Sequence, residues 1–277
     1  MHTIEDLQNL MARLRDPESG CPWDLQQDFH TITASTIEEA YEVADAIERG
    51  DLDHLAEELG DLLFQVIFYS QLGKERNLFS FDSVVDNIVT KLVRRHPHVF
   101  PDGNLYGENR TDLQAKDEDA IKASWENIKS QEREEKGHKS VIADVPVGLP
   151  ALSRAQKLQK RVAKAGWDWR DLEGVVDKLD EELNELKQAL ADQTNNPSER
   201  NESKVYEELG DLMFMTVNCA RFLKFDAENC LRDSNRKFER RIQGVESHLE
   251  DLGGSFHSAE SDDIDQAWEE VKAKEIL

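Results

Sequence analysis

The stretch His54-Leu-Ala-Glu-Glu-Leu-Gly-Asp-Leu-Leu-Phe64 decides the fold, because Lys204-Val-Tyr-Glu-Glu-Leu-Gly-Asp-Leu-Met-Phe214 repeats it 150 residues later. In each stretch a Glu and an Asp three residues apart share one face of a helix. Further matches flank this pair in the same order. They are Trp23-Asp24 with Trp167-Asp168, Glu38-Glu39-x-x-Glu42 with Glu181-Glu182-x-x-Glu185, Lys91-x-x-Arg94-Arg95 with Lys237-x-x-Arg240-Arg241, and Trp125-Glu-Asn-Ile-Lys129 with Trp268-Glu-Glu-Val-Lys272. We therefore infer a tandem duplication in which each copy is a domain.

The composition favours a helical protein with a strongly acidic surface. The 277 residues include 58 acidic and 34 basic side chains, a formal net charge of -24. Nucleic-acid binding depends on Lys and Arg that neutralise phosphates, so we expect no nucleic-acid partner. The chain start lacks secretory features, and its longest apolar run, Leu62 to Tyr69, is far shorter than the roughly 20 residues that span a bilayer. We expect a cytoplasmic protein without a membrane partner.

Helical periodicity and helix end signals occur in both copies, without a competing strand pattern. The sequence predicts helices at 33–49, 52–72 and 80–95, with Gly50 and Gly73 closing the first two. In the second copy it predicts helices at 172–193, 203–223 and 226–248, with a long polar loop over 194–201. The expected fold is all-α, with two tandem helical-bundle domains at 1–130 and 151–277. A charged run followed by Gly and Pro residues predicts a linker at 131–150.

Four carboxylates of the first copy are predicted to meet across a helical hairpin. Glu39 and Glu42 share a face of the first helix, and Glu58 and Asp61 share a face of the second. With the turn at Gly50, the two pairs lie at matching distances from it. The acidic pairs of the second copy lie at matching distances from a point between residues 196 and 197, which is therefore the expected turn of the second hairpin. This hairpin groups a corresponding second set, Glu182, Glu185, Glu208 and Asp211.

Carboxylates grouped in an apolar helix pair indicate a divalent-cation site. A buried carboxylate without a partner is costly, and a cation removes the repulsion within the group. Oxygen ligands without His or Cys favour Mg²⁺, with Mn²⁺ as a substitute, over zinc. An ordinary acidic helix is the alternative interpretation. The symmetry of the hairpin and its duplication favour the metal site.

A basic cluster follows each hairpin and offers contacts for phosphate oxygens that also bind the metal. Charges that satisfy the helix dipole are the rival explanation. The clusters are Lys91, Arg94 and Arg95 in the first copy and Lys237, Arg240 and Arg241 in the second.

The order Glu-Glu-x-x-Glu, Glu-x-x-Asp and Lys-Phe-x-Arg-Arg, the last at 237–241, resembles the MazG family of nucleoside triphosphate pyrophosphohydrolases. The resemblance covers nearly the whole chain, including the two copies and the closing Asp265-x-x-Trp268-x-x-Val-Lys272. It implies an all-α fold, a homodimer and a need for Mg²⁺. It also implies hydrolysis of NTPs or dNTPs to the monophosphate and pyrophosphate, as a housekeeping activity on the nucleotide pool.

The same resemblance assigns roles to residues of the second copy. The implied metal ligands are Glu182, Glu185, Glu208 and Asp211, and the matching first-copy set is Glu39, Glu42, Glu58 and Asp61. The expected substrate-binding residues are Lys178, Lys204, Glu207, Asn235, Lys237, Phe238, Arg240, Arg241 and Trp268. Of these, Lys237, Arg240 and Arg241 hold the triphosphate and are also expected to serve catalysis. Glu181 is the expected general base.

The two copies are not expected to be equivalent. Alignment of the basic clusters pairs Asn235 with Val89. Asn235 offers an amide that can donate to a phosphate or hold a water, whereas Val89 offers no polar group. We therefore expect the second copy to carry most of the activity.

Two other functions remain open on the residues alone. One is a non-catalytic helical module in which the carboxylates tie helices together through a cation. The other is a metal-dependent phosphohydrolase that releases orthophosphate, and product analysis separates it from a pyrophosphohydrolase.

Overall fold

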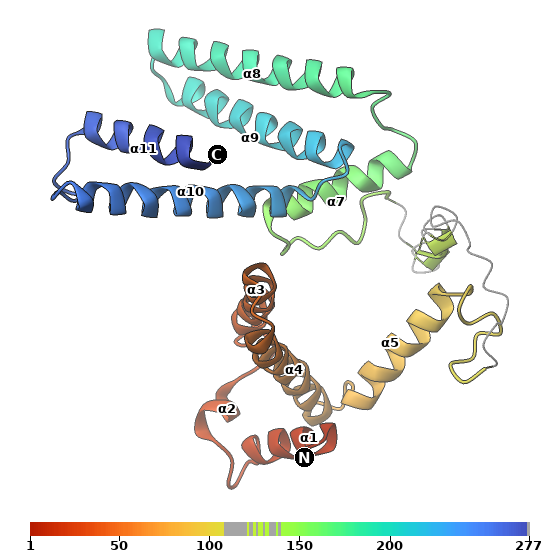
Figure 1. Ribbon diagram of the computed structural model, residues 1–277. Coiled ribbons are helices and arrows are strands. Elements are labelled where there is room, and N and C mark those ends of the chain that lie inside the picture. The colour runs from red at the N-terminus through yellow and green to blue at the C-terminus, as the bar shows by residue number, and fades with distance from the viewer. Residues whose placement is uncertain are drawn as a thin grey trace. The chain divides into compact units, whose positions relative to one another are not determined.

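A computed structural model describes residues 1–107 and 140–275, and between them residues 121, 124, 125, 127–129, 131, 132 and 137. The regular elements of these residues are all helices, which confirms the predicted all-α class. The chain divides into two compact units, Met1–Glu132 and Arg133–Leu277. Each unit contains a pair of long adjacent helices (Figure 1). None of the described helices is long and apolar enough to span a membrane. Within the predicted linker, residues 133–136, 138 and 139 lie outside the described residues.

The first unit is built around α3 and α4. Its helices are α1 (Ile4–Leu14), α2 (Pro22–Gln26), α3 (Thr33–Arg49), α4 (Leu52–Glu75) and α5 (Phe81–Arg95). Gly50 ends α3 in the left-handed conformation, with φ of 70°, and lets the chain reverse into α4. Asp51 then caps α4 by accepting a hydrogen bond from the backbone of His54. The core consists of buried apolar side chains from α1, the segment before α3 and the later part of α4: Met11, Ile32, Ile67, Phe68 and Leu72.

Gly73 does not close α4, in contrast to the sequence prediction. The helix runs through it to Glu75, and Gly73 is buried. A Cβ atom added to Gly73 would lie 2.7 Å from ring atoms of Phe79. Glycine is therefore required here for the close approach of the following segment. The prediction failed because tertiary packing and chain termination both favour glycine.

The second unit is built around α8 and α9. Its helices are α7 (Ala151–Lys164), α8 (Leu172–Asn195), α9 (Glu199–Phe222), α10 (Ala227–Asp251) and α11 (Ser261–Glu275). The loop between α8 and α9 is shorter than predicted, because α8 continues further and Ser198 caps α9. Asn201 donates a hydrogen bond to the carbonyl of Asn196 at 2.8 Å and closes this turn. The polar residues thus serve as caps within a short loop.

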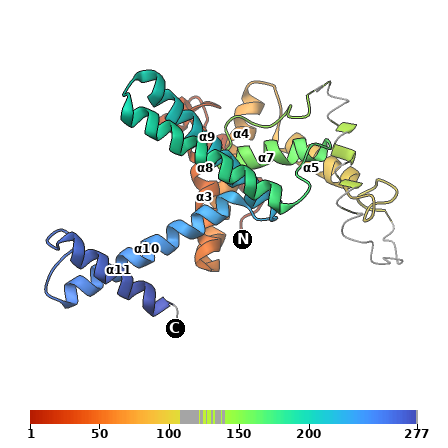
Figure 2. The ribbon, with the colours of Figure 1, turned by 90° about the horizontal axis from the view of Figure 1, so that it is seen from above.

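Two different neighbours pack against the two ends of α10. At its start, the Gln156 side chain of α7 donates to the carbonyl of Phe225 and accepts from the backbone of Ala227. Its later part forms a core with α11 through Val245, Leu249 and Ala267. Figure 2 shows α10 running away from the α8 and α9 pair, with α11 beside its far part.

Candidate functional site

The hairpin of the second unit brings carboxylates of two helices together. Glu182 and Glu185 of α8 and Glu208 of α9 each offer an oxygen within 4.8 Å of the others. Glu182 and Glu208 are buried, whereas Glu185 is exposed. Asp211, one turn beyond Glu208, is exposed and lies outside this group. Three of the four predicted ligands therefore meet around one point.

Two lysines reach into this group from the same helices. The Lys178 ammonium lies 2.9 Å from Glu182, and that of Lys204 lies 2.5 Å from Glu208. Each lysine is four residues before its glutamate, which is the spacing of neighbours on a helix face. Hydrogen bonding to Glu182 raises the pKa of Lys178, and hydrogen bonding to Glu208 raises that of Lys204. Both side chains therefore stay positively charged beside the buried carboxylates.

The set of carboxylates in the second unit, Glu182, Glu185 and Glu208, can bind a further cation besides the two lysines. The Oε2 atom of Glu182 is buried and has no hydrogen-bond partner among the described residues. A buried acceptor without a partner is destabilising unless an ion or water satisfies it. The ligand atoms are all carboxylate oxygens, the donors that hard divalent cations prefer. These residues fit a hard divalent cation.

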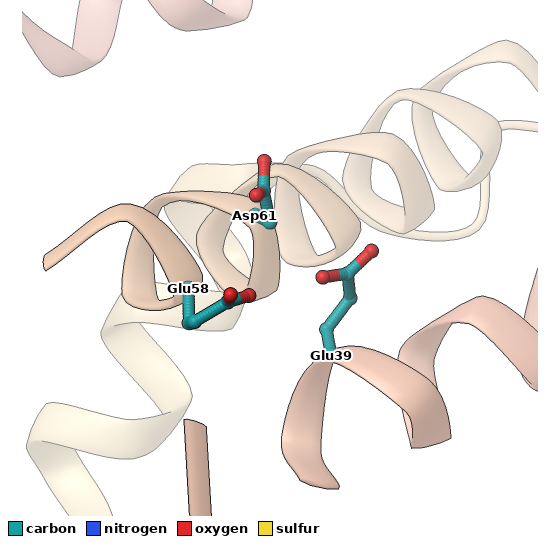
Figure 3. A group of neighbouring side chains, drawn as sticks. All are labelled: Glu39, Glu58 and Asp61. Carbon is teal, nitrogen blue, oxygen red and sulfur yellow. The ribbon is translucent and has the colours of Figure 1, made fainter. Parts of the chain in front are cut away.

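Glu39, Glu58 and Asp61 form the corresponding group of the first unit, also within 4.8 Å of one another. Figure 3 shows Glu58 of α4 reaching toward Glu39 of α3. His54 Nε2 lies 2.7 Å from the Glu58 carboxylate. Burial, the charges of Asp61 and Glu42 and a hydrogen bond with Glu42 raise the pKa of Glu39. Glu42 is therefore close to Glu39, although it lies outside the group of three.

The two groups differ in their cationic partners. The repeat pairs Lys204 with His54 and Lys178 with Ser35. Two permanent positive charges of the second unit are thus replaced in the first by an imidazole and a hydroxyl. This difference adds to the pairing of Asn235 with Val89.

The raised pKa of Glu39 gives the first prediction, on stability. The folded state binds this proton more tightly than the unfolded state, whose ordinary value is 4.5. The stability contributed by the bound proton is therefore lost as the pH rises above about 4.5 through the folded pKa. Thermal denaturation in EDTA, followed by circular dichroism, measures this effect. As the pH rises above about 4.5, the melting temperature of Glu39→Gln should fall less than that of the wild type.

Mg²⁺ should offset the same loss, because the cation takes the place of the proton between the carboxylates. Its stabilising effect on the wild type should therefore grow as the pH is raised. If the melting temperature depended on pH equally in wild type and Glu39→Gln, Glu39 would not be the source of the charge repulsion.

Basic and aromatic side chains of α10 and α11 form a second cluster. Arg240 and Arg241 both bind the Glu275 carboxylate, at 3.0 and 2.8 Å. The rings of Phe238 and Trp268 lie 5.8 Å apart, and the Arg241 guanidinium lies 5.5 Å from the Trp268 ring centre. The remaining predicted members of this cluster are exposed on α10: Asn235 and Lys237.

Among the described residues, no hydrogen bond or ion pair joins the basic cluster to the carboxylates of α8 and α9. Arg240 and Arg241 make their ion pairs with α11, and α10 leaves the α8 and α9 pair (Figure 2). The predicted border residues stay with the carboxylates: Glu181 binds Lys178 at 2.9 Å and Glu207 binds Lys204 at 3.3 Å. That the basic residues and the metal ligands share one site therefore stays a prediction.

Glu275, the partner of both arginines, was not among the residues predicted from the sequence. A signal was present, because Glu132 precedes Glu275 by 143 residues, the same offset that relates Trp125 to Trp268. Glu132 binds Arg94 and Arg95 in the first unit. The repeat therefore extends to this carboxylate in both copies.

Comparison with known proteins gives these clusters a family context. The MazG nucleotide pyrophosphohydrolase domain matches twice, at residues 27–100 and 170–245. The chain belongs to the MazG family. Each MazG match includes one carboxylate hairpin and one basic cluster.

Two relatives match over nearly their whole length. A nucleoside triphosphate pyrophosphohydrolase of Escherichia coli K12 is 46% identical over 280 residues, which is 100% of this chain and 99% of the relative. A nucleoside triphosphate pyrophosphohydrolase/pyrophosphatase MazG of Thermotoga maritima is 38% identical over 269 residues, covering 97% and 95%. The alignment with each relative therefore includes both units of this chain.

Proposed function

We propose that this protein hydrolyses nucleoside triphosphates to the monophosphate and pyrophosphate in a Mg²⁺-dependent reaction. The observation that carries the proposal is the buried group of Glu182, Glu185 and Glu208, with its unpartnered oxygen, in a chain of the MazG family. The names of the two full-length relatives support this substrate class. The acidic chain suits a cytoplasmic housekeeping enzyme of the nucleotide pool.

The carboxylates of α8 and α9 would hold the cation, with Asp211 completing the set from the next turn of α9. A bound divalent cation supplies electrostatic stabilisation of phosphate charge and makes a water more acidic. The water oxygen attacks the α-phosphorus, and the bond from this phosphorus to the oxygen bridging to the β-phosphorus breaks. The bridging oxygen and its electron pair leave with pyrophosphate.

Glu181 is the proposed acceptor of the proton from this water. It precedes the buried Glu182 and is itself exposed at the edge of the group. Its pairing with Lys178, which also binds Glu182 at 2.9 Å, supports this role. Lys178, Lys204 and Glu207 would border the bound phosphates.

The basic cluster would bind the triphosphate, with Trp268 and Phe238 against the nucleotide. Lys237, Arg240 and Arg241 would supply positive charge, and Asn235 an amide donor. Because α10 leaves the α8 and α9 pair in one chain, a complete site needs a rearrangement or a second copy.

A homodimer is the proposed assembly. Large apolar side chains remain exposed along the helix pair of the second unit: Leu183, Leu190, Leu209, Met213 and Phe214. Exposed apolar surface of this extent is typical of an interface. Two such helix pairs can cover each other as a four-helix bundle. Pairing of two copies would bury this surface.

Product analysis tests the proposed reaction. A panel of NTPs and dNTPs is incubated with the protein and Mg²⁺, and the products are separated by ion-exchange chromatography. We expect the nucleoside monophosphate and pyrophosphate in equal amounts from the first time point. NDP and orthophosphate as the primary products would show that the protein is a phosphohydrolase instead. Absence of products from every nucleotide would favour the non-catalytic module.

A further inference from the structure

Glu275, near the end of α11, holds both arginines of the basic cluster with one carboxylate. Its Oε1 accepts from Nε and Nη2 of Arg240 at 3.2 and 3.0 Å. Its Oε2 accepts from Nε of Arg241 at 2.9 Å, with Nη2 at 2.8 Å. The two guanidinium groups are therefore fixed side by side by a residue 34 and 35 positions further along the chain.

The contact uses only one edge of each guanidinium group. Arginine carries five N–H donors in a planar fork, and Glu275 takes those on the Nε and Nη2 side. Among the described residues, neither Nη1 group forms a hydrogen bond. The remaining donors suit a phosphate, which arginine binds through two parallel hydrogen bonds.

The same device is present in the first unit. Arg95 donates from Nε and Nη2 to Glu132 at 3.2 and 2.5 Å, and Arg94 donates from Nη2 at 2.5 Å. The two units are separate compact parts of a duplicated chain, and both copies keep this arrangement. The presence of the contact in both copies favours a retained structural feature over a chance surface ion pair.

Packing of α11 against α10 fixes the position of Glu275. Trp268 packs against the core of Val245, Leu249 and Ala267. Glu275 is seven residues beyond Trp268, which is about two helical turns and returns it to the same face. The guanidinium groups of Arg241 and Arg240 hold the pKa of Glu275 below its usual range, so the carboxylate is ionised at neutral pH.

We propose that Glu275 is a positioning residue that aligns Arg240 and Arg241 for the phosphates of the substrate. The proposal rests on the proposed function, because it takes the arginines to be phosphate ligands. A bound phosphate then finds the two side chains already ordered. Without Glu275, phosphate binding must itself immobilise both arginine side chains, at the cost of their conformational entropy.

The opposite role would be that of a competitor. A carboxylate placed on phosphate-binding arginines can also act as a substitute anion that substrate must displace. The two roles predict opposite effects of Glu275→Gln, which keeps the size of the side chain and removes its charge. A positioning residue weakens phosphate binding when it is replaced, and a competitor strengthens it.

The experiment measures inorganic pyrophosphate binding and steady-state kinetics on the full-length protein with Mg²⁺. Glu275→Gln is compared with wild type, with Glu275→Asp and with Asp262→Asn. Asp262 lies at the other end of α11, so its replacement changes the net charge equally without touching the arginines. Melting temperatures are recorded for all four proteins, and binding is measured by calorimetry well below the lowest of them.

We expect Glu275→Gln to weaken pyrophosphate binding and to raise KM for the NTP about tenfold, equivalent to about 1.4 kcal/mol. Its kcat should change much less, since the loss is one of uniform binding. Glu275→Asp, which keeps the charge, should lie between Glu275→Gln and wild type, and Asp262→Asn should match wild type.

Unchanged or tighter pyrophosphate binding in Glu275→Gln would overturn the positioning role. Pyrophosphate binding also separates this proposal from the reaction itself. If wild type hydrolyses no NTP but Glu275→Gln still binds pyrophosphate about tenfold more weakly, the proposed function fails and the positioning role stands. Absence of pyrophosphate binding to wild type would overturn the positioning role.

Discussion

Replacement of Glu182 or Glu208 by glutamine is expected to abolish pyrophosphate release, with a loss in kcat/KM of at least about 100-fold, or roughly 2.7 kcal/mol of barrier. Both carboxylates are buried in the group proposed to bind the cation. Glutamine keeps the shape of glutamate but removes the negative charge and one acceptor oxygen. Initial rates of pyrophosphate release, measured with a coupled assay, check this expectation.

The first unit supplies matched controls for these substitutions. Glu39→Gln and Glu58→Gln make the same chemical change in the corresponding hairpin, and we expect them to leave a substantial part of the activity. The reason is that the first unit has Val89, Ser35 and His54 where the second has Asn235, Lys178 and Lys204. If the first-unit variants silence the enzyme and the second-unit variants do not, the active half has been assigned wrongly.

Both sets of variants require a check of folding. Glu182→Gln should not unfold the protein in EDTA, because it removes one ion pair, with Lys178, and leaves the apolar packing intact. It should instead abolish the part of the Mg²⁺-induced stabilisation that comes from the second unit. A variant that is inactive and unfolded would carry no information on the site, so circular dichroism accompanies each rate.

Removal of divalent cations is expected to have the second large effect. EDTA should lower pyrophosphate release at least about 100-fold, because the carboxylates alone repel the phosphates that they must hold. Mg²⁺ should restore the rate and Mn²⁺ should substitute for it, whereas zinc should not, since the site offers only oxygen donors. Rates are measured in metal-free buffer after stepwise addition of each ion.

The same titration has a structural control. The apolar cores of both units consist of side chains other than the carboxylates. Helical content in EDTA should therefore stay close to that in Mg²⁺, while the melting temperature rises with the ion. Full activity in EDTA, with trace metals excluded, would rule out the proposed cation site.

Local signals in the sequence predicted most of the helices. Ser80 caps α5 and Asp226 caps α10, at the starts of helices that the sequence predicted, and Gly50 closes α3. These signals are readable because capping depends on hydrogen bonds within a few residues of the helix end. Gly73 misled the prediction, since its role is a contact with Phe79 beyond the helix.

The carboxylate groups were also predictable, and for a definite reason. Helical spacing fixes which residues share a face, and a short turn fixes the register of two antiparallel helices. Glu182, Glu185 and Glu208 meet as this arithmetic requires. Asp211 and Glu42 fall outside the groups, because helix rotation and the packing of each side chain are not set by spacing alone.

The sequence by itself thus determined the duplication, the helical class and the grouping of acidic residues, all of which follow from periodicity and local hydrogen bonding. Only the tertiary structure decided the partners of the basic cluster. The path of α10 depends on how its two ends pack, against Gln156 of α7 and against α11. That packing pairs Arg240 and Arg241 with Glu275 across a long stretch of chain, a contact for which helical spacing contains no rule.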